Sequence, residues 1–309
     1  MQNPEGLYQL HGNVSVVPAG LHLVAGLTGF ADAGSAVTRL SEYLLSSVEN
    51  RELAVFDADA LLDYRARRPM IYFDQDHLAD FRPPRLSLCL GTDEIGQPFL
   101  FLTGFEPDFQ WERFSAAVLQ LIAQFRVKST TWVHAIPMPV PHTRPIGVTV
   151  SGNRPELIDS MSIWKPRTQV QATALHLVEH RLQQQNHPTA GFVLLVAHYL
   201  ADTDFPGAVV KALESISAAT GLIFTTDSLR EEGRDFLTTI DKQVEINPEL
   251  ARLVGALEES HDSYMDGNPL RSPLTDVDGE LPSADEIAAE LENFLAARRN
   301  GDDTESSRK

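Results

Sequence analysis

Hydrophobic and polar residues alternate in blocks along the first two-thirds of the chain, and each block has the length of a strand or a helix. Residues 22–30 have strand composition and end in glycine, and apolar residues then recur every three or four positions over 37–48. Further β-like runs and amphipathic stretches follow in turn. The β-like runs are 53–56, 70–73, 86–90, 98–104, 130–136, 146–152 and 191–200, and the helical stretches are 108–125, 170–184 and 206–219.

This alternation of strands with helices predicts an α/β fold, a three-layer α/β/α domain with a mostly parallel sheet. The run at 191–200 is almost continuously apolar, as expected of a central strand that is covered on both faces. We therefore expect an α/β/α core over residues 1–228. A helical C-terminal region would follow over 229–300, with an acidic, Pro/Gly-rich linker near 266–284, and residues 301–309 would form a disordered tail.

The composition of the chain limits the classes of partner that it can bind. The 309 residues carry a formal charge of −18, which argues against nucleic acid because phosphate backbones require clustered Lys and Arg. No apolar stretch approaches the ~20 residues of a membrane span, and the N-terminus lacks the pattern of a signal peptide. The single cysteine, Cys89, lies in an apolar run and is expected to be a buried hydrophobe. We expect a cytoplasmic protein that binds neither nucleic acid nor membrane.

Two loops after predicted strands have the most distinctive residue types. The first is the glycine loop (residues 29–34), with Gly29 and Gly34 at its ends, where glycine permits positive φ and close backbone approach. Its Asp32 either caps the following helix or, next to Phe30, presents a carboxylate at a pocket or interface. A dinucleotide fingerprint is excluded because GxGxxG is absent, and a P-loop because no Gly-Lys-Ser/Thr follows.

The second is the proline loop (residues 137–145), which has four prolines in nine residues and is therefore stiff and extended. His142, Thr143 and Arg144 supply a titratable group, a hydroxyl and a guanidinium fork. Together they suit a phosphate, a carboxylate or an acidic partner. Alternatively, Arg144 pairs with an internal carboxylate such as Asp32 or Glu106.

Two further strand ends carry polar groups. Glu106 follows the run at 98–104, with Asp108 a candidate N-cap of the next helix, and His198 and Asp202 follow the run at 191–200. No HExxH, CxxC pair or GxSxG elbow occurs. We therefore predict that the protein binds no metal and no cofactor. The sequence identifies no catalytic residues.

Four segments in this order carry a family resemblance: GLTGFADAG, TGFEPDFQWERF, AIPMPVPHTRP and VAHYLADTDFPGA. They resemble the signature segments of the proteasome-assembly-chaperone family, in particular an actinobacterial branch of similar length, over about residues 8–260. The resemblance implies a core similar to the nucleoside phosphorylase-type fold, homo- or hetero-oligomers and, as in archaeal and eukaryotic relatives, binding to proteasome α-subunits. The chain ends in Ser307-Arg308-Lys309 rather than hydrophobic-Tyr-any, so docking through that tail is in doubt.

Two functions follow as hypotheses, and a structural oligomer that has no client protein is a third option. The leading one is a non-enzymatic assembly-chaperone-like or scaffold protein that self-associates, as a trimer or other small ring, and binds proteasome or AAA ATPase subunits. The alternative is a small-molecule enzyme or sensor, in which Arg144 and the amides of the glycine loop hold an anion and Asp32 or His142 acts as acid or base. A deep polar pocket would favour the second, and a contiguous apolar patch the first.

Overall fold

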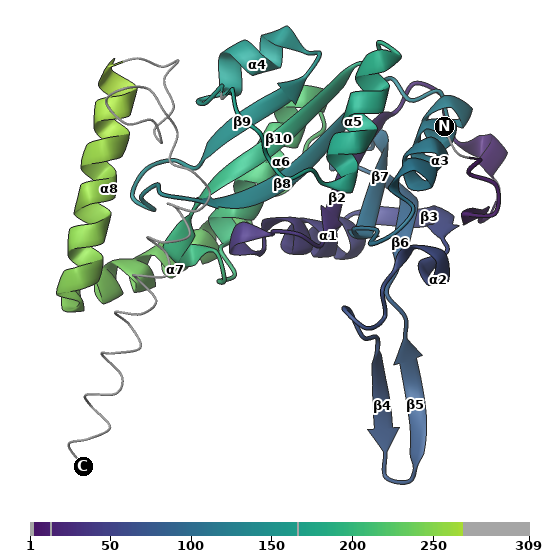
Figure 1. The fold of residues 1–309 in the computed structure, drawn as a ribbon, viewed down its shortest axis with the longest axis horizontal. Coiled ribbons are helices and arrows are strands. Elements are labelled where there is room, and N and C mark those ends of the chain that lie inside the picture. The colour runs from purple at the N-terminus through teal and green to yellow at the C-terminus, as the bar shows by residue number, and fades with distance from the viewer. Residues whose placement is uncertain (1–2, 13, 166, 268–309) are drawn as a thin grey trace.

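A computed structural model of the chain describes residues 3–12, 14–165 and 167–267. Its centre is an eight-stranded sheet in the order β1-β3-β6-β7-β2-β8-β10-β9 (Figure 1). The strands are β1 Tyr8–Leu10, β2 His22–Thr28, β3 Glu49–Phe56, β6 Leu86–Thr92, β7 Pro98–Phe105, β8 Ser129–Met138, β9 Gly147–Gly152 and β10 Thr189–Ala197. The four middle strands, β7, β2, β8 and β10, are parallel, and the flanking strands pair antiparallel.

Helices cover both faces of the sheet, which confirms the predicted three-layer α/β/α class. α1 (Ala36–Ser46) and α6 (Pro206–Thr220) pack together on one face, and α3 (Trp111–Gln124) and α5 (Ala174–Gln184) pack together on the other. Each face has its own hydrophobic cluster. α4 (Pro155–Met161) packs against edge strand β9, and the short α2 (Ala58–Leu61) follows β3.

Two long helices, α7 (Asp227–Ile246) and α8 (Pro248–Gly267), follow the core, with α7 packed on α6 and α8 packed on α7. Helices thus follow the α/β core on its C-terminal side, as the predicted fold class requires. Apart from residues 266 and 267, the predicted linker near 266–284 and the tail at 301–309 lie outside the described residues and stay predictions. No helix of the described part is long and apolar enough to cross a membrane.

Several element boundaries differ from the sequence prediction, and local backbone explains two of them. α3 starts at Trp111 because Gln110 adopts a left-handed conformation with φ 58°, so Asp108 is not its N-cap. α5 starts only at Ala174, where the Thr173 hydroxyl accepts a hydrogen bond from the amide of His176. The N-cap position of α6 is Phe205, and it makes no side-chain capping hydrogen bond.

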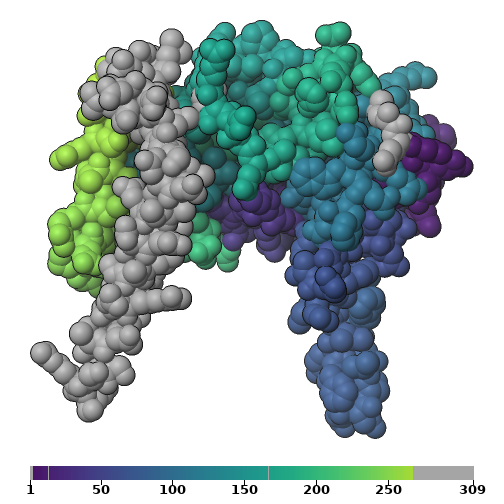
Figure 2. Space-filling view, in the orientation of Figure 1, coloured from purple at the N-terminus to yellow at the C-terminus, as the bar shows by residue number. Residues whose placement is uncertain are grey.

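The run at 70–73 forms a strand, β4 (Met70–Asp74), but it does not join the core sheet. With β5 (His77–Arg82) it makes a separate two-stranded hairpin that projects far from the body (Figures 1 and 2). We call residues 70–82 the arm. Its large apolar side chains are all exposed: Met70, Ile71, Tyr72, Phe73, Leu78 and Phe81. An apolar strand pattern therefore marked an exposed element here rather than a buried one.

A buried carboxylate joins strands and helix on the α3/α5 face. The indole of Trp132 on β8 lies across Gly191 of β10, and its Nε1–H donates to Oε2 of Glu179 on α5 at 2.6 Å. The Ser151 hydroxyl of β9 donates to the same oxygen at 2.8 Å, and the Gln183 amide donates to Oε1 at 2.9 Å. Burial nevertheless raises the pKa of Glu179.

We expect Glu179→Gln to raise stability near neutral pH. A carboxyl whose pKa is raised on folding binds its proton more tightly in the native state. The free energy of unfolding therefore falls as pH rises through the glutamate range. Glutamine keeps an oxygen for Trp132 and Ser151 and carries no charge to desolvate. Urea denaturation at pH 4 and pH 7.5 should show a higher midpoint for the variant only at pH 7.5. Exposed Glu42→Gln, the control, should leave both midpoints unchanged.

Candidate functional site

The glycine loop follows β2, and its carboxylate has a structural role. Asp32 Oδ1 accepts from the amide of Val37 at 2.6 Å, and Oδ2 accepts from the amide and the hydroxyl of Thr38 at 2.8 and 2.6 Å. These amides belong to the first turn of α1, whose orphan donors need such partners. These hydrogen bonds show that Asp32 caps α1, which is the first of the two roles considered for it.

Gly29 and Gly34 pack the glycine loop tightly against its neighbours. A Cβ on Gly29 would come within 2.7 Å of the Glu106 Cβ. Gly34 has φ +69°, and its amide donates to the Ala201 carbonyl at 2.8 Å while its own carbonyl accepts from Phe205. The loop is thus a junction between β2, β7 and the segment before α6. Phe30 points outward and is 57% exposed.

Glu106 lies at the end of β7, next to this junction. Its carboxylate accepts from the amide of Ala174, the first residue of α5, at 2.6 Å, where a helix N-terminus favours negative charge. Burial is the largest influence on Glu106 and raises its pKa. The side chain therefore ties α5 to the strand ends rather than facing a cavity.

Arg67, which the sequence analysis did not identify, anchors the base of the arm to the same strand ends. Its guanidinium donates to the Glu106 carbonyl and the Asp108 carboxylate and lies 5.7 Å from the centre of the Phe105 ring. Asp108 also accepts from the amide of Asp63. The signal in the sequence was weak: a short basic run, RARR, in an acidic chain.

In the proline loop, both ring nitrogens of His142 have hydrogen-bond partners within the protein. Its side chain is 1% exposed, with Nδ1 2.6 Å from the Tyr199 hydroxyl and Nε2 3.1 Å from Oδ1 of Asp241 on α7. The His142 amide donates to the Tyr199 oxygen, so that hydroxyl can give its one proton to Nδ1 while Nε2–H donates to Asp241. Burial raises the pKa of Tyr199 to about 12. Neither ring nitrogen is available to a substrate in this arrangement.

Arg144 and Thr143 hold α8. The Arg144 guanidinium makes a bidentate pair with Asp262, at 2.8 Å from Nε and 2.6 Å from the terminal nitrogen, and lies 3.2 Å from Glu258. The Thr143 hydroxyl donates to the same Glu258 carboxylate. We call these four residues the α8 clasp. Arg144 does pair with internal carboxylates, but with those of α8 and not with Asp32 or Glu106.

His198 and Asp202 both follow β10 but have different surroundings. The His198 ring packs edge-on against Tyr199, with 5.4 Å between the ring centres, while Asp202 is exposed in the following turn. The structure thus groups His142, Thr143 and Arg144 with Tyr199 and His198. Asp32, His142 and Arg144 do not converge on one site, because their partners lie on α1, α7 and α8 respectively.

We expect Arg144→Ala to release α8. The arginine holds the pKa of Asp262 at about 2, so the clasp is intact at neutral pH and is lost as pH falls toward 2. Without the guanidinium, Glu258 and Asp262 repel each other across one turn. Amide exchange in α8 should accelerate roughly three- to tenfold at pH 7, with the core strands unchanged. The control is Arg82→Ala, which breaks an exposed pair with Asp80 on the arm. Unaltered α8 exchange in Arg144→Ala would show that packing alone holds α8.

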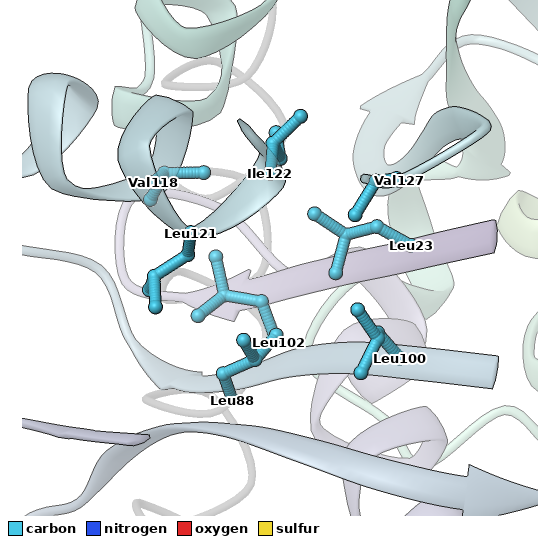
Figure 3. Close-up of a pocket in the computed structure, with 8 residues that line it drawn as sticks. All are labelled: Leu23, Leu88, Leu100, Leu102, Val118, Leu121, Ile122 and Val127. Carbon is cyan, nitrogen blue, oxygen red and sulfur yellow. The ribbon is translucent and has the colours of Figure 1, made fainter. Parts of the chain in front are cut away.

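Two cavities among the described residues differ in size and chemistry. One holds only about 10 Å³ between α3 and the sheet and is lined by eight aliphatic side chains (Figure 3). It has barely room for one water and offers that water no polar partner. The other, which we call the α6–α7 groove, is an open groove of about 360 Å³ that begins beside the proline loop. Within the described residues, no three His, Cys, Asp or Glu side chains gather as metal ligands.

Comparisons with known proteins place this geometry in a family. A protein of unknown function from Mycobacterium tuberculosis is 38% identical, with a TM-score of 0.80 over 85% of this chain and 93% of its own. One from Corynebacterium glutamicum is 32% identical, with a TM-score of 0.78 over 84% and 98%. A proteasome-assembly chaperone homologue from Mycobacterium tuberculosis shares the fold at 20% identity, with a TM-score of 0.69 over 76% and 100%. No curated protein matches. Since the sequence model of the PAC2 family matches residues 26–244, well over half of the chain, this protein belongs to the PAC2 family.

Proposed function

We propose that this chain is a non-enzymatic, assembly-chaperone-like or scaffold protein of the cytoplasm that self-associates through its arm and binds a protein partner. The observation that carries the proposal is the arm itself. Tyr72 and Phe73 are 61% and 65% exposed, and as successive residues of a strand they point to opposite faces. The arm is therefore apolar on both sides and buries neither.

An element of this kind needs a partner. An isolated two-stranded hairpin is at best marginally stable in water, and a contiguous exposed apolar surface marks an interaction site. The base of the arm is nevertheless fixed to the body by Arg67. We assign the arm to a second copy of this chain because a surface that is apolar on both faces must be covered at all times. A copy of the same chain is always present in matching amount.

The second half of the proposal, a protein partner, rests on the family and on the proline loop. A structure with the same fold is described as a proteasome-assembly chaperone homologue, which favours a partner from the proteasome or AAA ATPase system. The enclosed His142 and the clasped Arg144 weaken the alternative of an anion-binding enzyme or sensor, since their polar atoms already have internal partners.

Sedimentation equilibrium tests self-association. The wild type should form a discrete oligomer, and Tyr72→Ser/Phe73→Ser should shift it to monomer with an unchanged far-UV circular dichroism spectrum. Ile246→Ser is the matched control, because Ile246 is an 82% exposed apolar residue on α7, away from the arm. A strictly monomeric wild type at micromolar concentration would refute self-association through the arm.

Affinity capture from a lysate of an actinobacterium tests the partner. The wild type should recover a proteasome or AAA ATPase subunit, identified by mass spectrometry. The same capture with Tyr72→Ser/Phe73→Ser distinguishes a partner that needs the oligomer from one that binds the body. Recovery of neither class of subunit by either form would overturn the assignment of the partner.

A further inference from the structure

The α6–α7 groove has a charge pattern that the PAC2 assignment does not account for. Its floor is apolar, formed by Phe205, Leu229 and Leu237 among others, and its rim is basic. Lys211 and Arg234 line that rim. In a chain with 43 acidic and only 25 basic residues, basic side chains gathered along one groove indicate an acidic occupant.

Not all of this positive charge is already neutralised. Arg230, also on the rim, pairs with Glu214 at 2.6 Å, and Arg144 at the end of the groove is held by the α8 clasp. Within the part of the chain that the structure describes, Lys211 and Arg234 form no salt bridge. No carboxylate of the described residues is thus paired with either of these two rim cations.

The chain itself contains a segment of matching chemistry. Residues 276–292 include seven acidic residues and no basic one. Ile287, Leu291 and Phe294 recur at the spacing of one helical face, and Ser283 with Glu286 has the spacing of a capping box at its start. A helix of this pattern would present an apolar stripe flanked by carboxylates, which is how amphipathic helices bind apolar grooves.

The chain between the end of α8 and this segment is also long enough for the segment to lie along the groove. α8 ends at Gly267, and the 17 residues from there to 284 can extend about 55 Å. α7, which forms one wall of the groove, has 20 residues and is about 30 Å long. Asp262, five residues before the end of α8, pairs with Arg144, which lines the groove, so the segment starts from close to the groove and has the length to follow it.

We propose that the acidic segment 276–295 of the same chain docks in the α6–α7 groove, with Ile287, Leu291 and Phe294 on its floor and Glu286 and Glu290 toward Lys211 and Arg234. The docked segment covers the surface beside the proline loop. Any acidic partner of that surface must displace it. The inference does not depend on the arm or on the identity of the protein partner.

Disulfide cross-linking in the full-length chain tests this placement. Thr238→Cys lies on α7 one turn after Arg234, and Ala288→Cys lies beside Ile287, so the pair leaves every proposed charge intact. The native Cys89 does not interfere, because it is 0% exposed and burial raises the pKa of its thiol to about 11. The control pair combines Ala288→Cys with Ser160→Cys, which is exposed on α4 and does not line the groove.

Under mild oxidation the groove pair should form a disulfide at monomer mass at least about tenfold faster than the control pair, because docking raises the effective concentration of the thiols. Lys211→Glu/Arg234→Glu should lower that rate to the control value, and adding Glu286→Lys/Glu290→Lys should restore it. Equal rates for the groove and control pairs would overturn the proposal. A groove-pair product at dimer mass would overturn it too, and would assign the groove to the segment of a second copy.

Discussion

Replacing Gly191 by alanine is expected to destabilise the protein by roughly 3 kcal/mol or more, since it overpacks a filled core. A Cβ at this position would lie 2.3 Å from the Trp132 indole, which is itself 1% exposed. The indole cannot rotate away without breaking its hydrogen bond to Glu179 and leaving a buried carboxylate with one donor fewer. The steric and electrostatic costs therefore act together.

Urea denaturation followed by tryptophan fluorescence measures this effect, and a lower midpoint is expected. The matched control is Gly255→Ala in α8, where the added methyl meets no atom within 4 Å. That substitution should leave stability unchanged or raise it slightly, because alanine is the better helix former. If Gly191→Ala has the same midpoint as the wild type, the indole does not need the space that the structure assigns to it.

Gly104→Ala is expected to be at least as damaging, again roughly 3 kcal/mol or more. Gly104 has φ +133°, and its Cβ would lie 2.1 Å from the Arg85 carbonyl oxygen of the neighbouring strand segment. Backbone cannot yield as a flexible side chain does, so the β6–β7 pairing must open locally. Phe105 and Glu106 follow directly, and the contacts of Arg67 with both should loosen as well.

Gly96→Ala separates the cost of positive φ from the cost of the steric clash. Gly96 also has positive φ, at +84°, but a Cβ there meets nothing within 4 Å. It should therefore cost only the conformational penalty of about 1 kcal/mol. The difference between the two urea midpoints measures the steric part. Equal losses of stability would mean that the close approach to Arg85 contributes nothing.

Much of the core followed from periodicity, because its determinants are local. The buried strands β2, β7 and β10 have long apolar runs, and the helices that cover them carry stripes at helical spacing. The direction of each strand was harder to predict from the sequence. A run such as 86–90 has the same composition whether its neighbour is parallel or antiparallel. Composition also cannot show that 70–73 leaves the sheet, because apolar side chains suit a protein interface as well as a core.

The candidate site was only partly predictable, for a similar reason. Capping by Asp32 involves residues five and six positions away, within reach of pattern analysis. The partners of Arg144 lie 114 and 118 positions away, on a helix whose packing no local pattern fixes. With eighteen more acidic than basic residues in the chain, sequence alone could not single out Glu258 and Asp262.

The position of the arm in the chain has a consequence for biosynthesis. Residues 70–82 leave the ribosome before β8 and β10, two of the four parallel middle strands, which end at residues 138 and 197. The core sheet cannot be completed until those strands have been synthesised. A hairpin needs only contacts between residues close in sequence and forms in microseconds. If its partner is a second copy, arms of adjacent nascent chains on one messenger can pair while both bodies are unfinished. Subunits from the same messenger would then be favoured in each oligomer.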